Sequence, residues 1–189
     1  MNYYDQLPEG YVEDYVIDAK NVKFGIVFNV IAIAVAIIIV ALAVLIRNIS
    51  FLDMDLILLL PFFVVLLVYI VLHELVHGLF YKIFTKRKLT FGITWSAAFC
   101  GVPELYVKKT PMLVTILAPF TVFSLILIPL MIFIESPTVY FALSIILGFH
   151  VGGCSGDLYG AGIMLFKYSR NPELLCNDTG PKQSFYIKK

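Results

Sequence analysis

The sequence predicts an all-α integral membrane protein with four transmembrane helices and a short β-like cytoplasmic loop between helices 2 and 3. The composition is the first reason: 60% of the 189 residues are hydrophobic and only 14% are charged, with a mean hydropathy of +0.92, far from a soluble domain. Four apolar segments also reach the roughly 20 residues that cross a bilayer. No linker or repeat divides the chain, so we expect one membrane-embedded domain over residues 1–189.

The four predicted spans are residues 24–46, 56–84, 112–134 and 139–166. The first is uncharged, and it begins too late and runs too long to be a cleavable signal peptide. The second carries Pro61 in its first turns, where a missing N–H costs little. Each span is followed by a connection that contains charged residues.

The distribution of Lys and Arg predicts the orientation. Basic residues gather in the connection between spans two and three and in the C-terminal tail, namely Lys86, Arg87, Lys88, Lys108, Lys109, Lys167, Arg170, Lys182, Lys188 and Lys189. Cytoplasmic loops carry such an excess. We therefore expect a multi-pass protein of the cell membrane with both termini cytoplasmic. The net charge of +1 does not point to nucleic acid, and we expect none as a partner.

The second span contains the run His73-Glu74-Leu75-Val76-His77. Histidines four residues apart lie on one helical face, so both imidazoles can reach one Zn²⁺ while Glu74 points toward water bound to that metal. Ionisable groups are costly in hydrocarbon and normally mark a functional site. The alternative is a chance match, which is common in soluble helices.

A catalytic zinc takes three protein ligands and a water, so a third ligand is needed. Asp157 in the fourth span is the leading candidate, because an isolated carboxylate facing lipid is unfavourable. His77 lies seven residues before the end of its predicted span and Asp157 nine before the end of its own, which gives depths of about 10 and 13 Å. The matched depths predict a site in the cytoplasmic half of the membrane.

Other candidate ligands are weaker. His150 also lies in the fourth span but about 10 Å farther toward the outer face, so we expect a buried, hydrogen-bonded histidine or one that lines access to the site. Glu104 belongs to a polar loop, where a solvated carboxylate is expected. Cys100, Cys154 and Cys176 form neither a CxxC pair nor an even set, and we interpret them as reduced or incidental.

Glycines repeat at four-residue spacing along the fourth span, at Gly148, Gly152, Gly156 and Gly160. Such a stripe lets another helix approach closely. We expect it to pack against the second span and so to bring the short Asp157 side chain to the histidines. The alternative is an ordinary packing or dimerisation stripe, which leaves a homo-oligomer open.

The connection between spans two and three has strand-like composition. Residues 89–100 are rich in β-branched and aromatic side chains with partial alternation, and Gly101-Val102-Pro103 is typical of a turn. We expect a short strand or hairpin at the cytoplasmic rim, whose edge could hold an extended peptide by main-chain hydrogen bonds. The alternative is a simple interfacial loop anchored by Trp95.

These motifs resemble a known family. The runs His73–Gly78, Leu117–Pro119, Gly153–Asp157 and Cys176–Asp178 resemble the zincin peptidase family of small prokaryotic membrane proteins, a domain of unknown function, over residues 67–186. The arrangement is also similar to site-2 proteases, which place HExxH on one membrane helix and an Asp ligand on a later one. The site-2 pattern has glycine after that Asp, whereas Leu158 stands here. The resemblance implies a zinc peptidase.

The predicted function is an intramembrane zinc metalloprotease that cleaves membrane-spanning or membrane-inserted polypeptides in the lipid bilayer. His73, His77 and Asp157 would bind Zn²⁺, and Glu74 would be the general base toward metal-activated water. The alternative is a non-catalytic zinc-binding scaffold or a transport protein. A transporter usually shows repeated halves and polar groups along a path across the bilayer, and a structural zinc site favours cysteine ligands in a closed shell.

Overall fold

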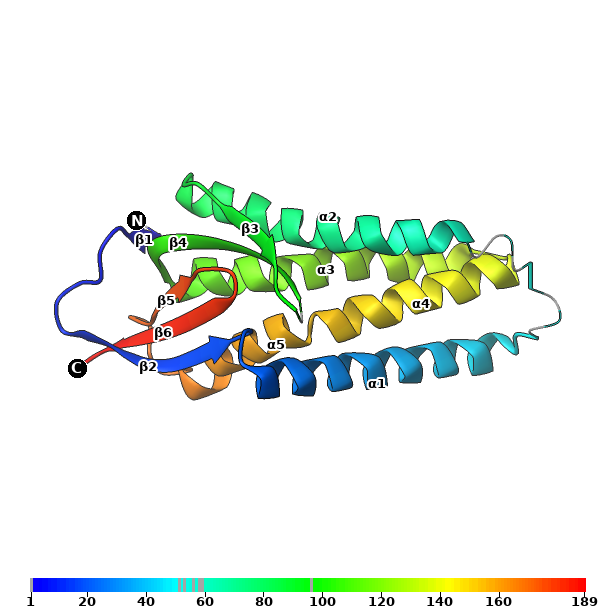
Figure 1. The fold of residues 1–189 in the computed structure, drawn as a ribbon, viewed down its shortest axis with the longest axis horizontal. Coiled ribbons are helices and arrows are strands. Elements are labelled where there is room, and N and C mark those ends of the chain that lie inside the picture. The colour runs from blue at the N-terminus through cyan, green and yellow to red at the C-terminus, as the bar shows by residue number, and fades with distance from the viewer. Residues whose placement is uncertain (1, 51, 53, 56, 58–59, 96) are drawn as a thin grey trace.

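The computed structural model describes all residues except 1, 51, 53, 56, 58–59 and 96, and consists of four long helical spans with a β-sheet at one end (Figure 1). The helices are α1 (Val22–Arg47), α2 (Leu60–Thr85), α3 (Lys109–Phe133), and α4 (Pro137–Gly153), which continues through α5 (Ser155–Gly162) and a π-helical turn (Ile163–Lys167). All four spans are long and apolar enough to cross a membrane. They indicate a multi-pass membrane protein.

The helix bounds agree with the predicted spans to within three residues wherever both are described. The predicted start of the second span, residues 56 and 58–59, lies outside the described residues. Local capping explains several ends: the Asn21 side chain accepts from the Lys23 N–H before α1, and Ser136 accepts from the Val139 N–H before α4. Asn48 closes α1 in the left-handed conformation, with φ of 48°.

The fourth span is one unit although α4 and α5 are separated at Cys154. The Cys154 N–H donates to the His150 carbonyl at 3.1 Å, and the Leu158 N–H donates to the Cys154 carbonyl at 2.8 Å. These i to i−4 hydrogen bonds carry the helix across the junction. Asp157 therefore follows the outer part of the span without a loop between them.

The β-sheet is larger than the sequence predicts. It has six antiparallel strands: β1 (Tyr3–Tyr4), β2 (Tyr11–Asp18), β3 (Thr90–Ile93), β4 (Ala98–Lys108), β5 (Leu175–Asp178) and β6 (Lys182–Lys188). The order is β1-β4-β5-β6-β2, and β3 pairs with β4. The prediction is therefore right for the four helical spans and wrong in describing the protein as all-α with one short β-like loop, because both tails join the sheet. β2 pairs with β6 from the other end of the chain, a pairing that leaves no local signal.

The predicted strand region forms a hairpin, with its turn earlier than expected. β3 and β4 are joined where the Thr94 N–H donates to the Ala97 carbonyl at 2.8 Å. β4 then runs straight through Gly101–Pro103, where we expected a turn, and has its irregularity at Glu104, with φ of 69°. Gly101 serves close packing instead, because a Cβ there would lie 2.3 Å from the backbone nitrogen of Gly180.

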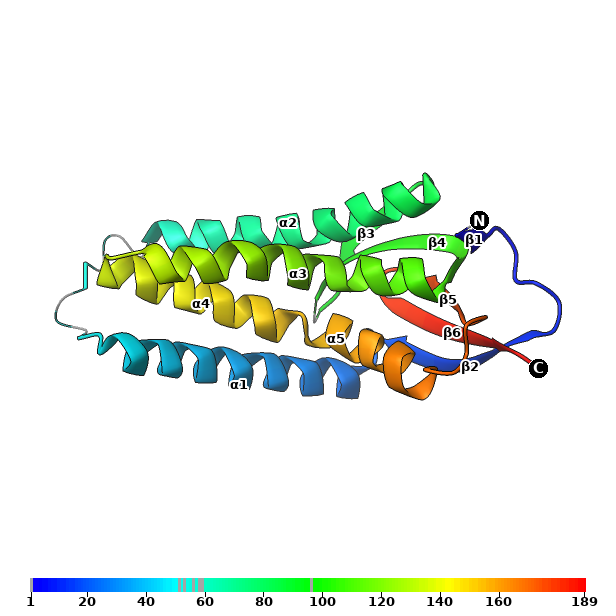
Figure 2. The ribbon, with the colours of Figure 1, turned by 180° about the vertical axis from the view of Figure 1, so that it is seen from behind.

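A hydrophobic core joins the sheet to the adjacent helix ends. Its fully buried members include side chains of β4, α3, the π-helical turn and β6, namely Val102, Val107, Met112, Met164 and Phe185. Seen from behind, the connections α1–α2 and α3–α4 lie at the end opposite the sheet (Figure 2). Both termini lie at the sheet end, the arrangement that an even number of spans requires, and the β3–β4 hairpin extends from that end toward the middle of the bundle (Figure 1).

Gly148 and Gly152 of the glycine stripe pack against α1, and Gly160 lies against Gln183 of β6 and Ile116 of α3. The prediction that the stripe packs against the second span is therefore wrong. A Cβ on Gly148 would lie 2.9 Å from the Cα of Ala36, and one on Gly152 would lie 2.4 Å from the Ala32 carbonyl oxygen. Ala32 and Ala36 repeat at the same four-residue spacing as the glycines. Two matching rows of small residues let the backbones of α1 and α4 meet.

Candidate metal centre

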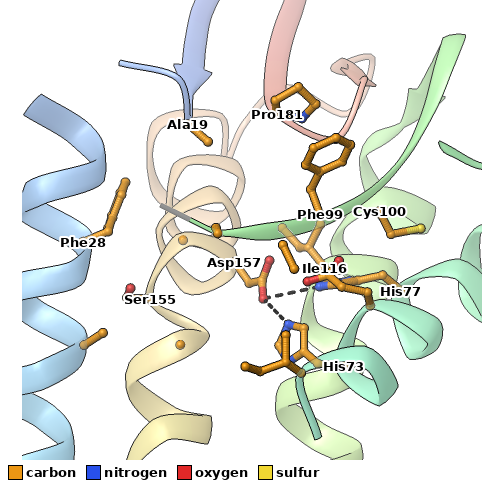
Figure 3. Close-up of a pocket in the computed structure, with 18 of the residues that line it drawn as sticks. Ala19, Phe28, His73, His77, Phe99, Cys100, Ile116, Ser155, Asp157 and Pro181 are labelled. Atoms are coloured by element: carbon orange, nitrogen blue, oxygen red, sulfur yellow. Dashed lines mark ion pairs between the residues drawn. The ribbon is translucent and has the colours of Figure 1, made fainter. Parts of the chain in front are cut away.

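Side chains of α2 and α5 converge on one point, where His73 and His77 face Asp157 (Figure 3). The Nε2 atoms of His73 and His77 lie 3.3 and 3.4 Å from the same oxygen, Oδ2 of Asp157. Two donors bound to a tetrahedral Zn²⁺ at 2.0–2.1 Å are about 3.4 Å apart. The spacing of these three groups therefore fits a zinc ion.

The position of the cluster along the helices follows from their packing. His77 lies eight residues before the end of α2 at Thr85, so the cluster occupies the half of the span nearer the sheet. Both histidines are buried, whereas the Asp157 side chain keeps 23% of its exposure because it faces a cavity that it helps to line. The depth argument from sequence thus brings together the three residues that meet in the structure.

A proline explains the orientation of His77. Its Nδ1–H donates to the carbonyl oxygen of Thr115 at 3.0 Å. In a regular helix that carbonyl would accept from the N–H four residues later, but this residue is Pro119, which has none. The freed carbonyl holds the His77 ring with Nε2 toward Asp157. Sequence reasoning missed Thr115, although Pro119 inside the span was a usable signal.

His73 has a different partner. Its Nδ1 lies 3.1 Å from the Tyr69 hydroxyl, which also lies 2.8 Å from Nδ1 of His150. Tyr69 was missed as well, although it stands four residues before His73 and therefore on the same helical face. His150 is fully buried, as expected, but it lies closer to the cluster than its seven-residue distance from Asp157 suggests.

Among the described residues, two groups have the ligand atoms and spacing to hold a metal ion. One is His73, His77 and Asp157, and the other is His73, His150 and Cys154. The two groups share His73, so they are neighbouring parts of one polar centre. Glu104 belongs to neither group and is exposed on β4, as the sequence predicts.

Glu74 faces the cavity beside the cluster. Glu74 lines the same cavity as Asp157, and Cys100 of β4 is part of the same cavity wall. The cavity has a volume of about 390 Å³. It lies between α1 and α2 and is bounded by the β4 end of the hairpin, α5 and the β5–β6 turn (Figure 3).

A second buried carboxylate, Asp178 on β5, contributes to the cavity wall. It accepts hydrogen bonds from the Tyr81 hydroxyl of α2 and, at 2.8 Å, from the Gly180 N–H. Burial raises the pKa of Asp178 to about 6, although both hydrogen bonds oppose the rise. Asp178 ties the C-terminal hairpin to α2. No local sequence pattern places this tail beside the cluster.

Comparison with known proteins adds one match. Neither the curated proteins nor the solved structures contain a significant match to this chain. A family model described as "putative zincin peptidase" matches residues 66–171, more than half of the chain. The matched range contains α3, α4, α5, the hairpin and most of α2, and it confirms the resemblance seen in the sequence. The chain belongs to this family of putative zincin peptidases.

Proposed function

We propose that the protein is an intramembrane zinc peptidase in which His73, His77 and Asp157 hold one Zn²⁺ and Glu74 is the general base. One observation carries the proposal: three donors from two helices converge at zinc-ligand spacing beside a carboxylate, in a cavity of about 390 Å³. Cavities of roughly 300 to 1,000 Å³ are typical of ligand sites. Family membership supports the same reaction class.

A zinc ion bound there would lower the pKa of its water and polarise the scissile carbonyl. Glu74 accepts a proton from the attacking water and passes it to the leaving amine. Thr115 fixes the ring of His77 through its carbonyl oxygen, so its Nε2 is free to bind the ion.

The cavity walls support a membrane-embedded polypeptide as substrate. Apolar side chains of α1 and α2 form the sides of the cavity, namely Phe28, Ala32, Ile33, Leu66 and Ile70. Residues 98–100 of β4 add a stretch of strand backbone, which could pair with an extended peptide. A helical substrate must unwind before it can bind this way, so spans that contain Gly or Pro are preferred.

The rival function is a protein that holds or carries zinc without catalysis. A structural zinc site is closed by four protein ligands, whereas the group proposed here has three and faces a cavity. A scaffold also has no use for a fourth ionisable side chain placed beside the ligands. Glu74 is therefore the residue on which the two functions differ.

The deciding experiment is Glu74→Gln in full-length protein purified in detergent. The variant keeps the size of the side chain and removes the base, so we expect about one zinc per chain by metal analysis and a loss of hydrolysis on the order of a hundredfold or more. Hydrolysis is measured on a membrane-tethered polypeptide in reconstituted vesicles.

Glu104→Gln is the matched control, because Glu104 is an exposed carboxylate of β4 outside the cavity. It should retain both zinc and activity. Unchanged cleavage by Glu74→Gln would refute the proposed mechanism. Loss of zinc from Glu74→Gln would instead make Glu74 a ligand or a support for one.

A further inference from the structure

We propose that Tyr69, His150 and Ser124 form a buried chain of hydrogen bonds that fixes the ring orientation and tautomer of His73. In this role they are positioning residues of the metal centre, and His150 is not a ligand. The inference rests on the proposed function in one respect, namely that His73 binds the metal through Nε2.

The chain of hydrogen bonds crosses three helices. It runs from Nδ1 of His73 to the Tyr69 hydroxyl at 3.1 Å, from that hydroxyl to Nδ1 of His150 at 2.8 Å, and from Nε2 of His150 to the Ser124 hydroxyl at 3.0 Å. His73 and Tyr69 belong to α2, His150 to α4 and Ser124 to α3. His150 has no exposed surface, so water does not compete at the centre of the chain.

The metal-binding role of His73 sets the direction of every donor. A ligand nitrogen must carry a lone pair, so Nε2 of His73 is unprotonated and Nδ1–H of His73 donates to the Tyr69 hydroxyl oxygen. The Tyr69 hydroxyl then donates its own proton to Nδ1 of His150. Nε2–H of His150 in turn donates to the Ser124 hydroxyl oxygen.

The chain of hydrogen bonds and metal binding favour the same tautomer of His73. With the donors in this direction, Nε2 of His73 carries the lone pair and faces Oδ2 of Asp157 at 3.3 Å. Reversing every donor would put the proton on Nε2 and block the ligand position.

Aromatic packing keeps the chain rigid. The ring of Phe120 stacks on His150 with centroids 5.7 Å apart, and Phe123 packs edge-on against Tyr69 at 5.0 Å. Both phenylalanines belong to α3, the helix that also orients His77 through Thr115. One helix thus positions both histidines from outside the metal centre.

The competing interpretation makes His150 a ligand together with His73 and Cys154. The Sγ atom of Cys154 lies 3.8 Å from Nδ1 of His150, close enough for a shared ion. The Tyr69 hydroxyl, however, is within hydrogen-bond distance of the Nδ1 atoms of both histidines. An ion bound between those nitrogens would have to displace it.

The first test is zinc affinity of Tyr69→Phe, measured by chelator competition on the purified full chain. The variant keeps the ring and removes only the hydroxyl, so we expect affinity to fall by about ten- to a hundredfold, as for other groups that support metal ligands. Tyr140→Phe is the matched control, because Tyr140 is 7% exposed, against 8% for Tyr69, and lies on α4 away from the site. A purely structural role would lower thermal stability in both variants and leave zinc affinity unchanged.

The second test is His150→Phe, alone and combined with Tyr69→Phe. If the residues act as one chain, the double variant should bind zinc no more weakly than the weaker single variant. Additive losses would contradict the proposal. So would complete loss of zinc in His150→Phe and in Cys154→Ala while Tyr69→Phe binds normally, because this result would make His150 and Cys154 ligands.

The two proposals fail differently. A wild-type protein that binds no zinc refutes both. A wild-type protein that binds zinc, with Tyr69→Phe within twofold of its affinity, refutes the hydrogen-bond chain alone and leaves the peptidase proposal standing. The Co²⁺-substituted protein gives a further readout, because a reoriented His73 would change its visible absorption spectrum.

Discussion

Two helix contacts in this protein are built in opposite ways. Between α1 and α4 the backbones touch, because Gly148 and Gly152 face Ala36 and Ala32 with no room for a Cβ. Between α2 and α5 polar side chains meet instead, and a cavity of about 390 Å³ lies beside them. One contact joins two helices tightly, and the other holds the candidate metal centre between them.

The difference has a physical reason. Lipid chains are as apolar as leucine, so helices in a bilayer associate through close packing of small residues and through polar contacts, not through the hydrophobic effect. The glycine stripe divides accordingly: Gly152 packs on α1, whereas a Cβ on Gly156 would meet nothing within 4 Å. The same repeat therefore anchors one part of the fourth span and leaves space around Asp157 in the next.

The largest effect is expected when the polar contact between α2 and α5 is removed. Asp157→Ala removes the carboxylate that both histidines face, so zinc should fall from about one ion per chain to near none, as measured by metal analysis after dialysis. His77→Ala should behave alike. Glu104→Ala, a change to an exposed carboxylate, should keep its zinc. Full occupancy in Asp157→Ala, together with loss in His150→Ala, would show that the third ligand is misassigned.

The next largest effect is expected when the backbone contact between α1 and α4 is disrupted. Gly152→Ala puts a methyl group 2.4 Å from the Ala32 carbonyl oxygen, so α1 and α4 must move apart, at a cost of about 1 to 3 kcal/mol. Gly156→Ala meets nothing and should stabilise its helix by roughly 0.5 to 1 kcal/mol. Thermal unfolding in detergent measures both. Equal melting temperatures for the two variants would contradict the division of the stripe.

A smaller effect is expected from Pro119 of α3, the proline that frees the carbonyl bound by His77. Pro119→Ala restores an N–H that competes with His77 for the Thr115 carbonyl, so zinc affinity should fall about tenfold while the helix itself becomes more stable. Pro129→Ala is the control: Pro129 is exposed in the same helix, far from the site, and its replacement should stabilise the protein without changing zinc affinity. Chelator competition and thermal unfolding together detect these opposite signs.

The last prediction concerns the orientation of the protein in the membrane and involves no change in stability or zinc affinity. Cysteines introduced near Lys88 and near Lys182 should be shielded from an impermeant thiol reagent in intact cells, and one near Ser50 should react. The three native cysteines are buried and give little background. Labelling near Lys88 from outside would invert the orientation and place the metal centre in the outer half of the bilayer.

Local patterns in the sequence determined the four spans and the histidine pair. Length and hydropathy are properties of each segment alone, so the helix bounds were predictable to within a few residues. The four-residue spacing of His73 and His77 places them on one helical face in any fold that keeps the helix. Asp157 could be matched to the two histidines because the depth of a residue in the bilayer can be compared between helices that are far apart in the sequence.

The tertiary structure alone decided which surfaces meet. The spacing of the glycines does not indicate which helix they contact, and only the packed structure shows that Gly148 and Gly152 lie against Ala36 and Ala32. β2 near the N-terminus pairs with β6 near the C-terminus. This pairing brings Asp178 to the cavity wall. The carbonyl that Pro119 frees gains its role only because α3 lies beside His77. The spacing of residues along one helix is set by the local sequence, whereas contacts between distant elements depend on how all the elements pack together.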